Sequence, residues 1–202
     1  MNKYSVIVFD LGNVLISFDY TPFLNKLESL KPGLGAKVGD LYKKNYNIHR
    51  EFEAGKLTNI EFLKIMMEWT EGLISEEQFC IIFSEIFIEN KNVVSLLPIL
   101  KEKYKLVLLS NTNAIHKKYG WEHYDFLKYF DKLCLSHEIG SVKPEKKIYK
   151  HVENIIDALP GELLFIDDVA EYAEGARKTG WDAIQFSGYD NLVAELNKRG
   201  IL

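Results

Sequence analysis

The segment Val6-Ile7-Val8-Phe9-Asp10-Leu11-Gly12-Asn13, near the start of the chain, carries the pattern that decides the fold. A short apolar run rich in β-branched residues, with no polar alternation, is typical of a strand buried on both faces. We therefore predict a strand over residues 4–9 that ends at Asp10. Similar runs predict further buried strands over residues 105–109, 132–136, 163–166 and 182–186.

Helical patterns separate these predicted strands, over residues 113–123, 145–157, 170–179 and 191–198. Strands that alternate with helices at this spacing are typical of a parallel sheet with helices on both faces. Because crossovers between parallel strands are right-handed, every strand should end at the same edge of the sheet. The predicted fold class is α/β, a Rossmann-like doubly wound parallel sheet.

Residues 19–89 interrupt this alternation, because they show no convincing strand. Their pattern predicts four helices, over residues 21–30, 36–46, 58–70 and 75–88, and Ser75 with Gln78 forms a capping-box sequence at the last start. We predict a small four-helix bundle over 19–89, inserted into an α/β core made of residues 1–18 and 90–202. Residues 47–56, which include His49 and Arg50, are expected to form a loop between two of these helices.

The composition restricts the class of protein. The chain has 202 residues, with 47% hydrophobic and 27% charged residues, which are close to globular averages and exclude a disordered chain. Its net charge of −4 and sequence pI of about 5.8 argue against general electrostatic binding to nucleic acid or anionic membranes. We therefore expect neither nucleic acid nor a membrane as a partner.

The cysteines and the start of the chain bear on location. Cys80 and Cys134 are far apart, with no CxxC spacing, and we interpret both as small buried hydrophobic residues. The early apolar run meets Asp10 without a small-residue cleavage site, so it is not a signal-peptide pattern. The expectation is a cytoplasmic protein in a reducing environment.

Polar residues follow the predicted strands. Asp10 follows the first, Ser110 and Asn111 follow the second, Lys143 comes after the third, and Asp167-Asp168 follows the fourth. Each has an ordinary explanation alone, such as a turn, a helix N-cap or a solvated helix start. Ligands of open parallel sheets bind beyond the carboxyl ends of the strands, so the combination predicts one site.

Three carboxylates at one edge repel each other unless a cation lies between them, and oxygen ligands suit Mg²⁺. Such an edge supports phosphoryl transfer, with Asp10 as the nucleophile that forms an aspartyl phosphate. Ser110 and the following amide would hold phosphate oxygens, and Lys143 would neutralise charge.

These segments together resemble the motifs of the haloacid dehalogenase-like (HAD) hydrolase superfamily. The resemblance rests on Val-Ile-Val-Phe-Asp10-Leu-Gly-Asn-Val-Leu, Leu-Leu-Ser110-Asn-Thr-Asn, Lys143-Pro144-Glu145 and Leu-Phe-Ile-Asp167-Asp168, in that order. The helical insertion is similar to the C1-type cap of subfamily I, and the branch most similar in these motifs contains glucose-1-phosphate phosphatase.

The resemblance implies an Mg²⁺-dependent phosphomonoester hydrolase that acts on a small phosphorylated metabolite, with sugar phosphates as one class. It implies metal binding by Asp10, the backbone carbonyl of Gly12 and Asp168, with Asp167 beside the ion or acting through water. It also implies a substrate site with Ser110, Asn111 and Lys143, and the cap segment adds Arg50 as a candidate contact to sugar or phosphate.

Two departures from the family pattern affect the expected chemistry. Most phosphatases of the superfamily have a second aspartate two residues after the nucleophile as general acid/base, whereas this chain has Gly12. Because such catalysis is worth about 10²–10⁴-fold, Gly12 predicts rates that depend steeply on the leaving group. A flat dependence would point to another acid, for example from the cap. Tyr172 and Val169 stand where asparagine and a polar residue are common, which bears on how the metal and Lys143 are oriented.

Three alternatives remain open at this stage. A metal-independent dehalogenase would use the same Asp10, but it has no use for the acidic pair Asp167-Asp168. A receiver-like signalling module has similar residue types, but its acidic pair ends the first strand rather than the fourth. A weakly active or non-catalytic relative that binds a sugar phosphate is compatible with Gly12.

Overall fold

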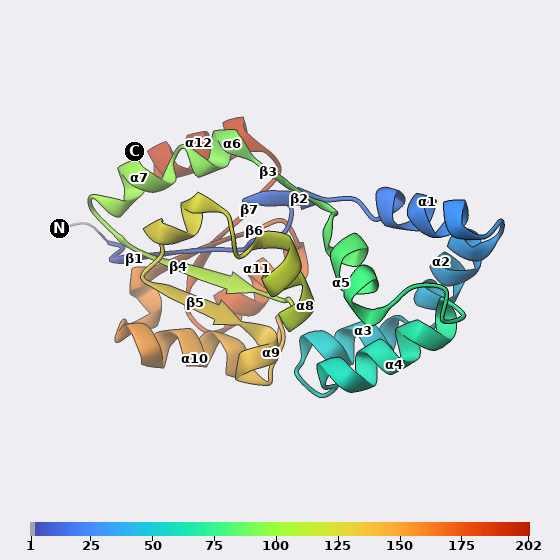
Figure 1. Cartoon of the computed structure of the whole chain (residues 1–202). Helices are drawn as coiled ribbons and strands as arrows, with labels where there is room; N and C mark the ends of the chain where they lie inside the picture. The colour runs from blue at the N-terminus through green and yellow to red at the C-terminus, as the bar shows by residue number, and fades with distance from the viewer. Residues whose placement is uncertain (1–2) are drawn as a thin grey trace.

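The computed structural model describes residues 3–202. Its main sheet consists of β1 (Val6–Phe9), β4 (Lys105–Ser110), β5 (Lys132–Leu135), β6 (Leu163–Asp167) and β7 (Asp182–Gln185). All neighbouring pairs are parallel, in the order β5-β4-β1-β6-β7 (Figure 1). In this register Phe9 pairs with Leu108 on one side and Ile166 on the other. The predicted α/β class and the strands are confirmed, and β1 is the central strand.

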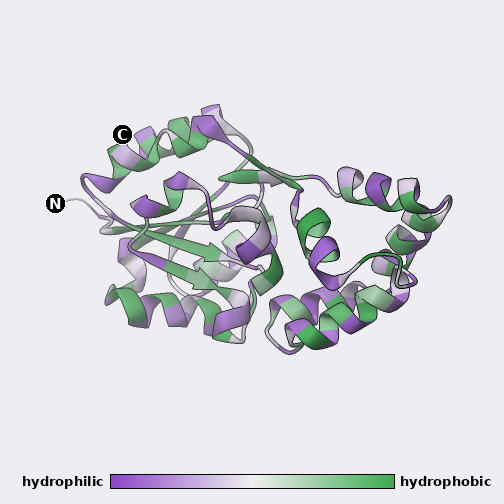
Figure 2. Cartoon of the chain, in the orientation of Figure 1, coloured by the Kyte–Doolittle hydropathy of each residue, from purple (hydrophilic) through white to green (hydrophobic). Residues whose placement is uncertain are grey.

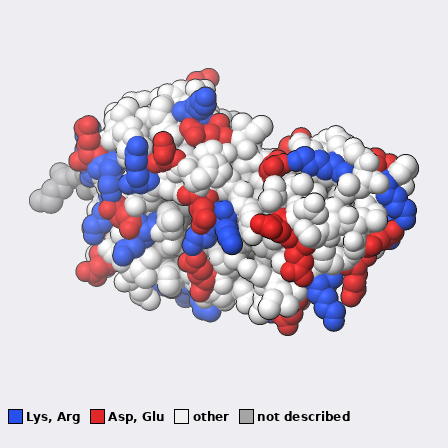
Figure 3. Space-filling view, viewed as in Figure 1, with Lys and Arg blue, Asp and Glu red and all other residues white. Residues whose placement is uncertain are grey.

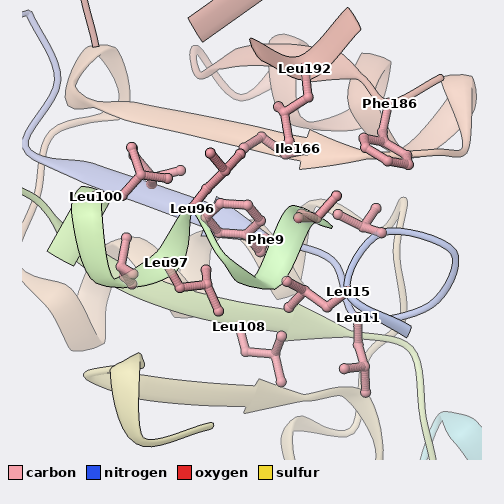
Figure 4. Close-up of a cluster of buried hydrophobic side chains, with 14 of the residues drawn as sticks. Phe9, Leu11, Leu15, Leu96, Leu97, Leu100, Leu108, Ile166, Phe186 and Leu192 are labelled. Carbon is pink, nitrogen blue, oxygen red and sulfur yellow. The ribbon is translucent and has the colours of Figure 1, made fainter. Parts of the chain in front are cut away.

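Helices cover both faces of this sheet because its strands carry apolar side chains on both sides. One face packs against α6 (Lys91–Val94), α7 (Leu97–Lys101) and α12 (Tyr189–Lys198), and Figure 4 shows Phe9 and Ile166 among their leucines. The other face packs against α10 (Lys146–Ile156) and α11 (Ala170–Lys178). Apolar residues therefore face inward from both layers (Figure 2), and each large buried side chain contributes about 1.5–3 kcal/mol.

The inserted segment forms α1 (Thr21–Leu30), α2 (Leu34–Lys44), α3 (Tyr46–Glu53), α4 (Asn59–Trp69) and α5 (Glu76–Ser84), which we call the cap. These helices pack around an apolar core of their own and lie to the right of the sheet in Figure 1. Capping boxes start α4 at Thr58 with Glu61 and α5 at Ser75 with Gln78. The capping box predicted at Ser75 is therefore confirmed.

The cap differs from the predicted four-helix arrangement, because residues expected to form a loop form α3 instead. Within α3, Glu53 pairs with His49 four residues before it and with Arg50 three residues before it. Such pairs stabilise a helix, and Phe52 of the same helix packs into the cap core. The loop prediction for this segment was wrong because these pairs have helical spacing.

A second difference lies where the cap meets the sheet. The helix predicted to run to residue 88 ends at Ser84, and β3 (Phe87–Glu89) follows it. This strand pairs antiparallel with β2 (Ile16–Phe18), so that Phe18 lies opposite Phe87. The two connections between cap and sheet therefore run side by side (Figure 1), which the sequence analysis did not foresee.

The predicted helix over residues 113–123 is also irregular. It consists of α8 (Ala114–His116) and a π-helical turn, η1 (Lys117–Trp121). Gly120 lies against Phe87, where an added Cβ would approach the ring to 2.5 Å. π-Helical turns such as η1 are frequent near functional sites. The remaining elements are η2 (Asp125–Tyr129), α9 (Ser136–Ile139) and η3 (Pro160–Glu162).

Three further expectations concern the cysteines, membrane spans and surface charge. Cys80 and Cys134 are buried free thiols, and burial raises the pKa of the Cys134 thiol to about 12. This confirms that both behave as small buried hydrophobic residues. Within residues 3–202, the helices are all too short or too polar to span a membrane. On the face shown in Figure 3, basic and acidic side chains are interspersed.

Candidate active site

The parallel strands bring the predicted acidic residues together. Asp10 directly follows β1, Asp167 is the last residue of β6, and Asp168 comes next. Carboxylate oxygens of these three residues lie within 4.8 Å of one another. The sequence predicted that these residues share one edge of the sheet, and the pairing of β1 with β6 makes them neighbours there.

Lys143 is the cation at the centre of this cluster. Its Nζ lies 2.7 Å from Asp10 Oδ1 and 2.7 Å from Asp167 Oδ2, and it donates a hydrogen bond to the Leu109 carbonyl at 3.2 Å. Asn111 holds the Lys143 backbone, because its Oδ1 accepts from the Lys143 amide at 2.8 Å and its Nδ2 donates to the carbonyl at 3.2 Å. The Lys143 side chain is 1% exposed, and these contacts hold its ammonium in place.

The electrostatics of this cluster favour a further cation. Burial raises the pKa of the Asp10 carboxyl above its usual range, Lys143 opposes this shift, and Asp167 adds to it. Burial also raises the pKa of Asp168. Although burial disfavours the Lys143 ammonium, Asp10 and Asp167 hold its pKa above the usual range, so it stays charged. Because one ammonium faces three carboxylates, the site carries an excess of negative charge.

The oxygen donors at this edge fit Mg²⁺. Both oxygens of Asp167 are engaged, one with Lys143 and the other with the Val169 amide at 2.8 Å. Asp168 accepts a hydrogen bond from Asn13 at 3.1 Å, which orients its carboxylate. Asp10 and Asp168 therefore present the available oxygen ligands that a hard cation requires, while Asp167 orients Lys143.

Two adjoining cavities lie between this edge and the cap. One of about 200 Å³ is lined by Asp10, Lys143 and Asp168, with Arg50 from the cap. The other, of about 150 Å³, is lined by Ser110 and aromatic residues of the cap. Both cavities share the same short set of lining residues, namely Gly12, Phe18, Tyr46, Glu53 and Asn111. The two cavities therefore meet at Gly12 and these shared residues.

Arg50 connects the cap to the catalytic edge. Its guanidinium donates to the Lys143 carbonyl at 3.3 Å, to Glu53 at 3.0 Å and to the Tyr172 hydroxyl at 3.5 Å. The structure therefore brings this predicted residue into the site, although it lies on α3 rather than in a loop.

The departures noted in the sequence have structural counterparts. The Tyr172 ring lies 5.1 Å from the Lys143 ammonium, a cation–π arrangement that helps to orient the lysine. Val169 lines the cavity beside Asp168, and its backbone amide donates a hydrogen bond to Asp167. A Cβ added at Gly12 would approach the Phe18 ring to 3.2 Å, so this ring fills the space beside the glycine.

Sequence reasoning missed some residues of the site. Asn13 adopts a left-handed conformation (φ 54°), which asparagine tolerates, and this turns its amide towards Asp168. Its place after Gly12 in the motif was the available signal. Tyr42 and Glu53 had no local signal, because their proximity to Gly12 depends on how the cap docks.

The haloacid dehalogenase-like hydrolase family model matches residues 4–180, which include the cap and every strand of the main sheet except β7. The chain belongs to this family. The HAD resemblance seen in the motifs is therefore confirmed, and with it the assignment as a hydrolase.

Characterised HAD relatives act on phosphorylated compounds. The chain is 27% identical to D-ribitol-5-phosphate phosphatase of Bacteroides thetaiotaomicron, across 89% of this chain and 90% of that protein. It is also 27% identical to a phosphorylated carbohydrates phosphatase of Thermotoga maritima, across 84% and 82%. A HAD family enzyme of B. thetaiotaomicron, solved with magnesium and inorganic phosphate, is 28% identical with a TM-score of 0.77, covering 90% of this chain and 93% of that one.

Proposed function

We propose that this HAD hydrolase is an Mg²⁺-dependent phosphatase that cleaves monoesters of small phosphorylated metabolites, sugar phosphates in particular. The observation that carries the proposal is the cluster at the end of β1. There Asp10 lies 2.7 Å from the Lys143 ammonium, and its oxygens lie within 4.8 Å of Asp167 and Asp168. In this position the Asp10 carboxylate can attack the phosphorus of a negatively charged phosphate monoester.

Each residue has a defined role in the proposed reaction. An Asp10 oxygen attacks phosphorus, the bond to the leaving oxygen breaks, and an aspartyl phosphate forms that water then hydrolyses. Lys143 stabilises negative charge on the phosphoryl oxygens, and Ser110 with the amide of Asn111 donates hydrogen bonds to them. Bound by Asp10, Asp168 and the Gly12 carbonyl, Mg²⁺ would reduce the repulsion between carboxylate and phosphate.

The relatives support the substrate class, because both characterised phosphatases named above act on phosphorylated sugars or sugar alcohols. The size of the site is consistent with such a group. The cavity beside Gly12, of about 150 Å³, has room for several waters and therefore for a small alcohol portion.

Hydrolysis of p-nitrophenyl phosphate and a panel of sugar phosphates, with Mg²⁺ and after chelation, tests this function. We expect activity that needs Mg²⁺ and falls at least about 10³-fold in Asp10→Asn, because the nucleophile is lost. Asp190→Asn, at an exposed position of α12, is the matched control. Full activity in Asp10→Asn would refute the mechanism, and chelator-resistant dehalogenation of 2-chloropropionate would support the dehalogenase instead.

A further inference from the structure

Three polar side chains of the cap form a hydrogen-bonded chain beside the active site. The Tyr42 hydroxyl lies 2.5 Å from His49 Nδ1, and His49 Nε2 lies 3.2 Å from Glu53 Oε1. His49 is 7% exposed and Glu53 is 8% exposed, and all three residues line the cavity that contains Gly12 and Ser110. Burying each of these three polar side chains costs free energy of desolvation, so their presence beside the active site suggests a function.

The charged and titratable groups around His49 determine how the Tyr42–His49–Glu53 group can transfer protons. Glu53 and Arg50 lie on α3 with Tyr46, whereas Tyr42 comes from α2, Tyr20 precedes α1, and His116 belongs to α8. Although burial opposes it, the contacts with His49 and Arg50 lower the pKa of Glu53, so it stays ionised.

The two neighbouring groups keep fixed protonation states. Burial, with a smaller effect of His49, lowers the pKa of His116 to about 3, so this second histidine stays neutral near pH 7. Burial raises the pKa of Tyr42, so its hydroxyl keeps its proton. His49 therefore lies between the Tyr42 hydroxyl, the Glu53 carboxylate and a neutral imidazole.

The contacts also define which atom carries each proton. The Glu53 carboxylate accepts hydrogen bonds only, so His49 Nε2 donates to it. When His49 is neutral, Nδ1 accepts the proton of the Tyr42 hydroxyl. When His49 is an imidazolium, Nδ1 donates to the Tyr42 oxygen, and the hydroxyl proton goes to another acceptor, which is either the Tyr20 hydroxyl or a group in the cavity. A carboxylate that orients a histidine, which in turn activates a hydroxyl, is a recurrent catalytic arrangement.

We propose that Tyr42, His49 and Glu53 form a proton relay that supplies, from the cap, the general acid and base that Gly12 lacks. The proposal rests on the phosphatase function above. Gly12 has no side chain to donate a proton, the Phe18 ring occupies the adjacent space, and Glu53 lines the cavities on both sides of Gly12.

The proton balance closes within one turnover. As the bond from phosphorus to the ester oxygen breaks, that oxygen takes the Tyr42 proton, the Tyr42 oxygen takes the Nδ1 proton, and His49 becomes neutral. In the second step, water attacks the aspartyl phosphate and gives a proton to Tyr42, which passes its own to Nδ1. The relay is thereby restored, and the net reaction consumes only ester and water.

Leaving-group dependence separates this catalytic role from a structural one. We would measure kcat/KM for substituted phenyl phosphates and alkyl phosphates with wild-type protein, Tyr42→Phe and Glu53→Gln. p-Nitrophenolate leaves without a proton, whereas an alkoxide needs one. We expect a shallow dependence on leaving-group pKa in the wild type. In Tyr42→Phe, kcat/KM for alkyl phosphates should fall about 10²–10⁴-fold, while kcat/KM for p-nitrophenyl phosphate falls much less, because this constant covers only the steps up to release of the leaving group.

Tyr189→Phe, on α12, is the matched control for loss of a hydroxyl. Equal losses for aryl and alkyl substrates, or no loss for either, would overturn the relay. If Tyr42→Phe does not fold, as judged by circular dichroism, the comparison of alkyl with aryl phosphates is made with Glu53→Gln. This substitution hardly changes the volume of the side chain. Failure of the proposed function is distinguishable, because the wild type would then not hydrolyse p-nitrophenyl phosphate with Mg²⁺.

Discussion

The buried ring of His116 shows how one residue links the stability of this protein to pH. It packs against Phe83 and Phe87 of the cap connection, with ring centroids 4.4 and 5.2 Å away. Burial lowers its pKa from 6.5 to about 3. The unfolded chain therefore binds a proton at a higher pH than the folded chain does, and stability is lost as pH falls below about 6.5.

We expect the free energy of unfolding of the wild type to fall by about 2 kcal/mol, relative to His116→Gln, between pH 6.5 and 5. The substitution removes the titrating group, and urea denaturation at several pH values measures the difference. His137, whose pKa is also lowered by burial, contributes equally to both proteins and cancels. Parallel stability curves for the two proteins would contradict this assignment.

Whether a site residue could be predicted from the sequence depended on whether it lies at the end of a predicted strand. Asp10, Ser110 and Asp167 lie at the carboxyl ends of parallel strands, so their place at one edge of the sheet follows from the alternation of strands and helices. The order β4-β1-β6, which makes them neighbours, does not follow from that alternation. Tyr42 and Glu53 approach Gly12 only because the cap docks on the sheet edge, a long-range contact without local pattern. The sequence therefore could not predict that Tyr42 and Glu53 belong to the site.

Among the elements, α3 determines how the cap contacts the core. Gly55 follows this helix with φ of +67°, and an added Cβ would lie 2.4 Å from the His137 carbonyl oxygen of α9. Only glycine permits both the left-handed conformation and this close approach. The same helix carries Arg50 and His49, so a displacement at Gly55 would move both away from the site.

Gly55→Ala should therefore reduce both stability and activity. We expect a loss of about 1–2 kcal/mol from the left-handed backbone, together with a lower kcat for sugar phosphates as α3 moves. Gly72→Ala is a matched control, since φ is +65° and nothing lies within 4 Å of the added Cβ. Urea denaturation and steady-state kinetics compare the two, and an equal effect on kcat in both variants would rule out the contact with His137.

The errors in the predicted elements have a common physical cause. The segment of α3 is mostly polar, a pattern that favours a loop, yet the paired charges of Glu53 with His49 and Arg50 favour a helix. The segment of β3 has a local pattern that continues the preceding helix, and it forms a strand because it pairs with β2, more than 65 residues distant in sequence. Local pattern identified the strands of the main sheet, which are apolar throughout, and it failed where a distant partner decided the structure.

For the molecule as a whole, Mg²⁺ should act as a stabilising ligand. The ion would bind the folded carboxylate cluster and not the unfolded chain, so its binding energy adds to the free energy of unfolding. At a concentration of 100 times Kd, the expected gain is about 2.7 kcal/mol. Thermal unfolding with increasing MgCl₂ measures it, and Asp168→Asn should lose most of the gain while Asp190→Asn keeps it. An unchanged melting temperature in the wild type would argue against a metal at this site.

The antiparallel pair of β2 and β3 has a consequence for how such proteins diverge. Because the chain enters and leaves the cap through neighbouring strands, the two ends of the inserted segment meet at one place. A segment whose ends meet can be exchanged as a cassette without separating the rest of the chain. Evolution can therefore change which alcohol is accepted, and even where its proton comes from, while Asp10 and Lys143 keep the chemistry at phosphorus constant.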